Sequence, residues 1–417
     1  MGLCTPFARY WLSGFLADFG DGVRLAAFPL LATEFTRSAT AVAAVTAVQG
    51  LPWLVLGAGL GVLVDRTDRR RLMVVVDLAR AAIIAGLAAA ILAHSAGLVL
   101  IYLTAFSTGV GSALRDTAAV TCVPRLVDTA DLDRANAGVI AGQIIGNELA
   151  GLAAGGWLFG LAAVLPFAVN AGTLGISVLL LLTLPSVFRP VSQPARQRPA
   201  TSLAALRQEL AEGFGWLGRH STIRDVTIAV GIMAAMDAAW IAVLVLYVIQ
   251  TLHQRPGMYG LLLATAAAGG LGPPITRRLG RWRSLLTAGL VMAASQAVLG
   301  LTANVIIAAA MLAASSAAWV LFDMTTVTMR QRQVPDNLLG RITSLYRTAL
   351  QGSQALGALA GGLVAAAAGI RATMLIGALP IAATAILLTW HHRGTAASPL
   401  TAELTRPLRS DEADQES

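Results

Sequence analysis

The chain has 417 residues, of which 56% are hydrophobic before its 41 glycines are counted, and only 12% carry a charge. A soluble globular domain has about twice that charge density, so the composition excludes an ordinary soluble protein. The net charge of +8 comes from arginine alone, because all 30 basic residues are arginine. These arginines separate apolar runs instead of forming a patch, which argues against a nucleic-acid partner.

Twelve apolar runs divide the chain. A helix needs roughly 20 apolar residues to cross a hydrocarbon core of about 30 Å, and cutting the sequence at charges and at glycine or proline breaks gives runs of that length. We therefore predict an all-α protein with 12 transmembrane helices in a lipid bilayer. In chain order the predicted spans are residues 10–34, 40–64, 72–93, 98–121, 136–158, 161–185, 225–249, 257–278, 283–303, 305–329, 343–366 and 370–391.

The distribution of arginine predicts how the spans are oriented. The loops after runs 2, 4, 8 and 10 and the centre of the chain are rich in arginine, whereas the loops on the other side hold only Arg37, Arg255 and Arg371. Cytoplasmic loops of membrane proteins carry the excess of positive charge, so we expect both termini and the central segment in the cytoplasm. Residues 1–8 lack a basic n-region, so no cleavable signal peptide is expected.

The chain divides into two predicted six-helix halves, residues 1–185 and residues 223–392. Residues 186–222 are expected to form a cytoplasmic linker, because Pro, Ser, Gln and Arg replace apolar residues at its start. The apolar residues of its second part recur with the period of an amphipathic helix. This favours a helix that lies in the membrane interface, and a helix that binds a partner is the alternative. The polar residues 393–417 are expected to be a disordered cytoplasmic tail.

A glycine pattern occurs once in each half. Four glycines of the fifth run return 206 residues later in the eleventh run: Gly146, Gly151, Gly155 and Gly156 correspond to Gly352, Gly357, Gly361 and Gly362. Small residues let membrane helices approach closely, so the last three glycines of each set are expected to be close-packing positions. Repeated halves with a site between them are typical of secondary transporters.

The loop between the second and third runs carries a motif. It reads Gly61-Val62-Leu63-Val64-Asp65-Arg66-Thr67-Asp68-Arg69-Arg70-Arg71, which resembles the loop signature G-x-L-A-D-R-x-G-R-R of the major facilitator superfamily. A plain positive-inside loop would explain the arginines but not the glycine and the first carboxylate at these offsets. The resemblance implies a cytoplasmic gate formed by Gly61, Asp65, Arg66, Arg69 and Arg70. At Asp68, where the family usually has glycine, we expect a strained turn.

Further stretches resemble the branch of this superfamily that contains bacterial siderophore and macrolide exporters. They include Gly20-Asp21-Gly22, Asp77-Leu78-Ala79-Arg80 and Pro124-Arg125-Leu126-Val127. The resemblance implies two six-helix halves in a bacterial plasma membrane. The stretch Gly151-Leu152-Ala153-Ala154-Gly155-Gly156 is similar to the antiporter signature G-P-x-x-G-G, but Leu152 occupies the proline position, so antiport is not carried over directly.

Charged residues inside the spans are the candidate site. Each costs about 3 kcal/mol on insertion scales and therefore requires a reason. Spans 1, 4, 7 and 10 line the central cavity of the superfamily fold, and the resemblance places five charged residues on those helices: Asp21, Arg24, Arg115, Asp237 and Asp323.

Three more residues complete the predicted substrate and proton pathway. Glu148 lies near the middle of the fifth run without a local cation, which makes it a candidate proton carrier, and Trp240 and Trp319 are candidates to stack on a flat or cationic substrate. Simpler roles stay open: acids paired with arginine lock the packing, neutral Glu148 bonds to a neighbouring helix, and tryptophans anchor in the interface.

The sequence offers no support for an enzyme, a cofactor or a metal site. None of the five histidines lies mid-span or shows metal spacing, and a chain without lysine has no phosphate-cradling G-x-x-x-x-G-K-S motif. The two cysteines, Cys4 and Cys122, are too few for a disulfide scaffold.

The resulting hypothesis is a monomeric secondary transporter that exports a hydrophobic or drug-like small molecule in exchange for protons by alternating access. Two alternatives remain open at this stage. One is an importer of a nutrient or siderophore. The other is a membrane receptor or scaffold that kept the fold without transport. Two departures from the family signatures favour it: Leu152 in the fifth run, and Thr276, where the loop after the eighth run lacks the carboxylate of the equivalent loop after the second run.

Overall fold

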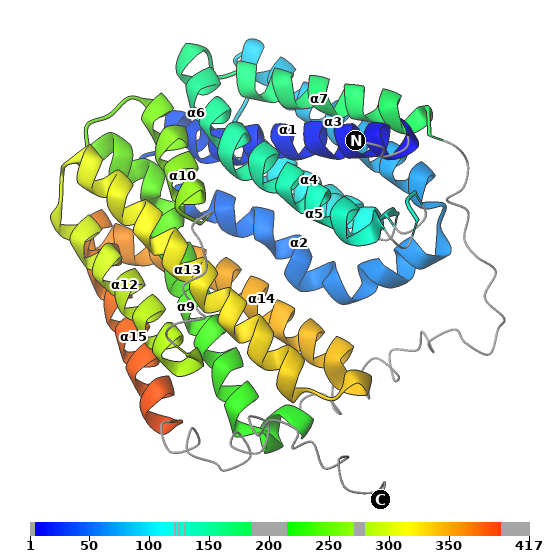
Figure 1. The fold of residues 1–417 in the computed structure, drawn as a ribbon. Coiled ribbons are helices and arrows are strands. Elements are labelled where there is room, and N and C mark those ends of the chain that lie inside the picture. Colours follow the sequence, from blue (N-terminus) through cyan, green and yellow to red (C-terminus); the bar gives the residue numbers. More distant parts are fainter. Residues whose placement is uncertain are drawn as a thin grey trace, which may run out of the picture.

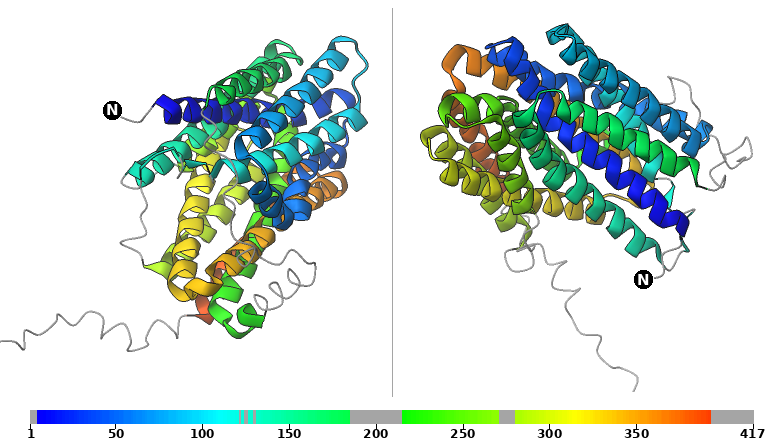
Figure 2. Two further views of the ribbon diagram at one scale, coloured as in Figure 1. Left: turned by 90° about the vertical axis from the view of Figure 1, so that its right-hand side faces the viewer. Right: turned by 90° about the horizontal axis from the view of Figure 1, so that it is seen from above.

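The computed structural model describes residues 5–120, 122–123, 126–128, 131–184, 215–270 and 280–392. The predicted linker helix falls mostly outside these residues, and the predicted tail falls entirely outside them. Figure 1 shows two groups of helices, the first half in blue to green and the second in lighter green to red, and the turned views of Figure 2 show the same division.

The helices of the first half follow one another with short connections. Their bounds are α1 (Thr5–Phe35), α2 (Ala39–Arg66), α3 (Arg69–Leu92), α4 (Leu98–Val120), α5 (Leu132–Gln143), the π-helix η3 (Ile144–Gly151), α6 (Leu152–Leu161) and α7 (Leu165–Leu182). The second half consists of α9 (Ser221–Leu246), the π-helix η5 (Tyr247–Thr251), α10 (Pro256–Gly270), α12 (Arg281–Leu301), α13 (Val305–Gln333), α14 (Asp336–Ala368) and α15 (Ile370–His391).

Each of the twelve predicted spans coincides with a helix or a continuous run of helices, so the all-α prediction is confirmed. Within the described residues, eight of these helices or runs are long and apolar enough to cross a membrane. Large apolar side chains on their outer faces are exposed, for example Val99, Leu379 and Trp390. An apolar exterior of this extent is the surface of a multi-pass membrane protein.

Local chemistry sets several helix ends. The Ser38 hydroxyl caps α2 by accepting a hydrogen bond from the amide of Ala41 at 3.3 Å, and the Asn304 side chain caps α13 through the amide of Ile306 at 2.8 Å. Between α14 and α15 a single residue, Gly369, has φ of +92°, a conformation that glycine adopts without strain.

The fifth span contains a feature that its hydropathy does not predict. Within the run at 136–158, residues 144–151 form a π-helix between α5 and α6. Hydropathy measures how apolar a segment is. It does not show whether the backbone hydrogen bonds join residues four apart, as in an α-helix, or five apart, as in a π-helix, so the π-helix cannot be predicted from the apolar pattern. Glu148 lies within this π-helix.

The repeated glycines make equivalent contacts in the two halves. Gly155 faces α1 so closely that a Cβ atom there would lie 2.3 Å from the carbonyl oxygen of Val23. Gly361, its counterpart in α14, faces α9, and a Cβ would lie 2.1 Å from the carbonyl oxygen of Ala239. Gly151 and Gly357 show the same closeness, to α1 and α9 respectively. The fifth and eleventh spans therefore occupy corresponding places in their halves.

The last glycine of each set joins the halves to each other. A Cβ at Gly156 would lie 2.7 Å from the amide nitrogen of Gly260 in α10, and a Cβ at Gly362 would lie 2.6 Å from the Cβ of Ala43 in α2. The Thr40 hydroxyl also donates a hydrogen bond to the carbonyl of Gly362 at 3.2 Å. These contacts all lie near the ends of the spans opposite to the linker, so the halves meet at that end.

Candidate functional site

A network of buried charges lies inside the first half. It begins at Asp21 on α1, which accepts from Arg24 at 3.4 Å and from the hydroxyl of Ser112 at 3.2 Å. Arg80, which enters from α3, forms a second ion pair with the same carboxylate. The local pair between Asp21 and Arg24 that their spacing suggests is therefore present, but it is part of a larger arrangement across three helices.

Asp77 continues the network toward α4 and α7. Its two oxygens accept from Arg80 at 3.4 Å and from Arg115 at 2.9 Å, and the hydroxyl of Ser177 donates to it at 3.0 Å. Arg115 also donates to the backbone carbonyl of Ser13 at 3.2 Å. Three arginines and two aspartates thus alternate from α1 through α3 to α4.

The charged side chains of this network are almost completely buried. Arg24, Arg80 and Arg115 are at most 4% exposed, and Asp77 is 0% exposed. The sequence makes room for them: a Cβ at Gly111 of α4 would lie 2.5 Å from Cδ of Arg80, so only glycine leaves space for that stem. Charges at this depth persist only when they are paired and hydrogen-bonded.

A cavity of about 780 Å³ opens beside the network. Its lining comes from both halves, because α1, α3, α4 and α5 of the first half face Arg347 and Gln351 of α14. All of these residues lie near the ends of the spans that adjoin the linker, opposite to the glycine contacts. The two halves are therefore in contact at one end of the spans, and a cavity lies between them at the other end.

The cavity wall combines rings, amides and charges. Trp11 and Phe15 stack with their ring centroids 5.5 Å apart, and Asn136 and Gln143 of α5 contribute amide groups. Of the residues predicted for the substrate and proton pathway, only Arg115 lines the cavity, where it connects the wall to the buried network.

Two carboxylates of the cavity wall were missing from the predicted site. Asp18 lies one helical turn before Asp21 on α1, and Asp116 follows Arg115 on α4. Both lie in the cavity wall beside Arg115, where a bound molecule or an ion can reach them. Their positions in the sequence could have identified them, because Asp18 lies on the same helix face as Asp21 and Asp116 is next to Arg115.

Glu148 is exposed, and no hydrogen bond or ion pair joins its side chain to another residue in the described part of the chain. It lies one turn before Leu152 and two turns before Gly156, and these two residues contact Gly260 of α10. Glu148 therefore lies along the junction between the halves, between the closed end and the open end.

The predicted residues of the second half form separate pairs. The indole N–H of Trp240 donates to Asp237 at 3.0 Å, and the hydroxyl of Tyr346 donates to Asp323 at 2.9 Å. Trp319 packs against the core of this half. None of these residues lines the cavity, so the structure separates them from Arg115.

The predicted gate is described in part. Arg70 donates to the carbonyl of Leu181 at 2.8 Å and to that of Leu182, which ties the loop to the end of α7. Arg69 opens α3. The surroundings of Gly61 and the side chains of Asp65 and Arg66 fall outside what the structure describes.

The strain expected at Asp68 is wrong. Asp68 has φ of −67° and ψ of 111°, an ordinary extended conformation, and its carboxylate caps α3 by accepting from the amide of Arg71 at 3.1 Å. Aspartate at this position therefore acts as an N-cap and does not need the left-handed turn that would favour glycine.

Two six-helix halves that meet at one end, with a cavity and buried charges at the other, define a transporter of the major facilitator type. The sequence agrees: the family model described as transmembrane secretion effector matches residues 4–407, and the chain belongs to this family of the major facilitator superfamily. The chain is thus a multi-pass membrane transporter and not an enzyme.

Individual proteins support this assignment. The chain is 29% identical over 376 residues to the enterobactin exporter EntS of Salmonella typhi, which covers 86% of this chain and 85% of the exporter. Among solved structures, the nucleoside transporter NupG matches with a TM-score of 0.70 at 13% identity, over 95% of this chain and 100% of NupG. A bacterial homologue of the human lysosomal transporter Spinster, in an inward-facing conformation, matches with a TM-score of 0.70 at 16% identity, over 93% and 96% of the two chains.

Proposed function

We propose that the protein exports a small hydrophobic or drug-like molecule across the bacterial plasma membrane in exchange for protons. The observation that carries the proposal is the cavity between the halves, closed at one end by glycine contacts and open at the other beside a buried charge network. With the orientation that the arginines predict, this cavity opens to the cytoplasm, where an exporter must collect its substrate.

The lining of the cavity fits a moderately sized aromatic molecule. A volume of about 780 Å³ lies within the range of small-molecule sites. Trp11 and Phe15 offer aromatic faces, and Asn136, Gln143 and Gln351 offer hydrogen-bonding amides. Because similar proteins are named enterobactin exporters, enterobactin is the first substrate to test.

Proton coupling requires a carboxyl group that gains and loses a proton as the halves move. Glu148 suits this role because it has no partner in the described part of the chain and lies along the junction between the halves. Asp18 and Asp116 on the cavity wall are the carboxylates that a proton or a cationic substrate reaches first. Loss or gain of a proton on these acids changes the charge beside the buried network. The network, which includes Asp21, Arg24 and Arg115, transmits this change between the helices that it joins. Asp237 and Asp323 lie apart from it.

The direct test uses inside-out membrane vesicles, in which export is measured as uptake. We expect labelled enterobactin to accumulate when the vesicle interior is acidic, and accumulation to fall when the proton gradient is collapsed. Uptake that ignores the gradient would contradict the coupling. Accumulation in right-side-out vesicles alone would identify an importer, and binding without flux would identify a receptor.

Glu148→Gln tests the proposed proton carrier. We expect it to abolish gradient-driven uptake while substrate exchange without a gradient continues, because the neutral amide cannot release a proton. Glu34→Gln is the matched control, since Glu34 is an exposed glutamate near the end of α1. Normal gradient-driven uptake by Glu148→Gln would remove this residue from the mechanism.

A further inference from the structure

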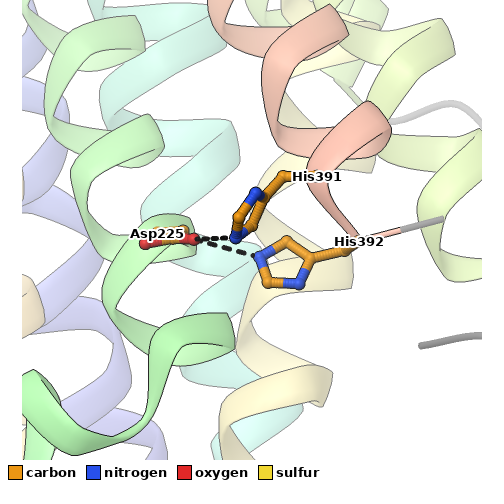
Figure 3. Close-up of side chains that lie close together, drawn as sticks. All are labelled: Asp225, His391 and His392. Carbon is orange, nitrogen blue, oxygen red and sulfur yellow. Dashed lines mark hydrogen bonds and ion pairs between the residues drawn. The ribbon is translucent and has the colours of Figure 1, made fainter. Parts of the chain in front are cut away.

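A cluster of three potential metal ligands lies in the second half, on residues that do not line the cavity. Asp225 on the first turns of α9 faces His391 and His392 at the end of α15, as Figure 3 shows. The Oδ2 atom of Asp225 lies 3.1 Å from Nε2 of His392 and 3.9 Å from Nε2 of His391. All three ligand atoms lie within 4.8 Å of one another.

These groups match the ligand chemistry of a divalent transition metal. Two imidazole nitrogens and one carboxylate oxygen are the set that Zn²⁺ accepts, at bond lengths of about 2.0–2.2 Å, with a water at the fourth position. Tetrahedral bonds of that length place neighbouring ligand atoms roughly 3.4 Å apart, close to the two distances from Asp225. His391 is 62% exposed at the end of its helix, so its ring can turn inward to complete the set.

Neighbouring residues hold two of the ligands in place. The ring of Trp282 on α12 stacks on His392, with centroids 4.9 Å apart and planes inclined by 7°. Arg224 donates to the other carboxylate oxygen, Oδ1 of Asp225, at 2.9 Å and so leaves Oδ2 directed at the two histidines. Outer groups that orient a ligand in this way are typical of metal sites.

We propose that Asp225, His391 and His392 bind one divalent transition-metal ion of the Zn²⁺ class. The ion links the start of α9 to the end of α15 and is independent of the transport cycle proposed above. The simpler arrangement, a hydrogen bond between Asp225 and His392, needs neither His391 nor a metal. The contribution of His391 therefore separates the two.

The test uses the full-length protein in detergent, purified with a tag that contains no histidine. Zn²⁺ is titrated by calorimetry, and Co²⁺ is added as a spectroscopic substitute whose visible absorption reports tetrahedral coordination. We expect one ion per chain, with affinity that falls at acid pH because protons compete for the imidazoles. Absence of saturable one-to-one binding would overturn the proposal.

Variants assign the ligands. His391→Ala and Asp225→Asn should each weaken Zn²⁺ binding by about tenfold or more, since even outer-shell changes cost 10–100-fold. His253→Asn is the control, because His253 lies in the loop after η5 and asparagine tolerates its positive φ of 52°. His391 is exposed, so its variant is expected to fold, and an unchanged gel-filtration profile checks this. Equal binding by His391→Ala and the parent protein would show that the ion is adventitious.

Discussion

Arg80 joins the two carboxylates of the buried network. It pairs with Asp21 on one side and with Asp77 on the other, and its side chain is 1% exposed. Removing it leaves both aspartates deficient in positive charge inside the bundle, where an uncompensated charge is far more costly than a broken surface pair.

We therefore expect Arg80→Ala to lower the free energy of unfolding by about 3–5 kcal/mol and to abolish transport. Thermal unfolding in detergent and vesicle uptake measure the two effects. Arg255→Ala is the matched control, because Arg255 is exposed in a loop and its loss should change stability by less than about 1 kcal/mol. Equal stability of the two variants would mean that Arg80 does not hold the network together.

The ion pairs of the buried network could be predicted from the sequence only where both partners lie on one helix. The pair between Asp21 and Arg24 follows from their spacing on one helix. The links of Asp21 with Arg80 and of Asp77 with Arg115 join different helices and have no spacing to reveal them. Asp225 and His392 are 167 positions apart, so the expectation of no metal site tested only local spacing.

At the scale of helices, prediction worked where the cause is local. Hydropathy located all twelve spans because the membrane requires about 20 apolar residues in succession. The glycine register located the surfaces between helices, because only glycine permits contacts at backbone distance. The π-helix at 144–151 was not predicted, since its cause is the packing of a whole span and not its composition.

Two alanine substitutions test the glycine packing, with opposite expected signs. Gly155→Ala places a methyl group 2.3 Å from the carbonyl oxygen of Val23, so α1 and α6 must separate, at a cost of about 1–3 kcal/mol. Gly172→Ala on α7 meets nothing within 4 Å and should stabilise the helix by about 0.5–1 kcal/mol. The melting temperatures of the two variants in the same detergent give the comparison. A stabilised Gly155→Ala would contradict the close approach of α1 and α6.

At the scale of the whole molecule, the structure corresponds to one state of the transport cycle proposed above. The resemblance to a family predicts two halves and a cavity but not which end is closed, because that depends on contacts between distant spans. Here Gly156 against Gly260 and Gly362 against Ala43 close the end away from the linker. Alternating access requires these contacts to separate in every cycle so that the substrate can leave.

A removable cross-link at the closed end tests this requirement. Gly160 on the last turn of α6 lies near Gly257 on the first turn of α10, and a Cβ at Gly160 would be 3.7 Å from the amide nitrogen of Gly257. A disulfide spans Cα atoms about 4.4–6.8 Å apart, and this contact, with one bond beyond each of its two atoms, keeps the two Cα atoms within the upper limit. We expect Gly160→Cys with Gly257→Cys, in a chain whose Cys4 and Cys122 are replaced, to lose uptake under oxidant and to regain it under reductant.

The single variant Gly160→Cys, treated in the same way, controls for oxidation of other groups. Its uptake should not change, because one thiol cannot bridge the halves. Cross-linking of the double variant is scored separately by electrophoresis after cleavage in the loop between the halves, so that failure to form the bond is not mistaken for tolerance of it. A cross-linked protein that transports at the parent rate would show that the halves need not part at this end. The substrate would then have to leave by a path that leaves the contacts of Gly156 and Gly362 intact.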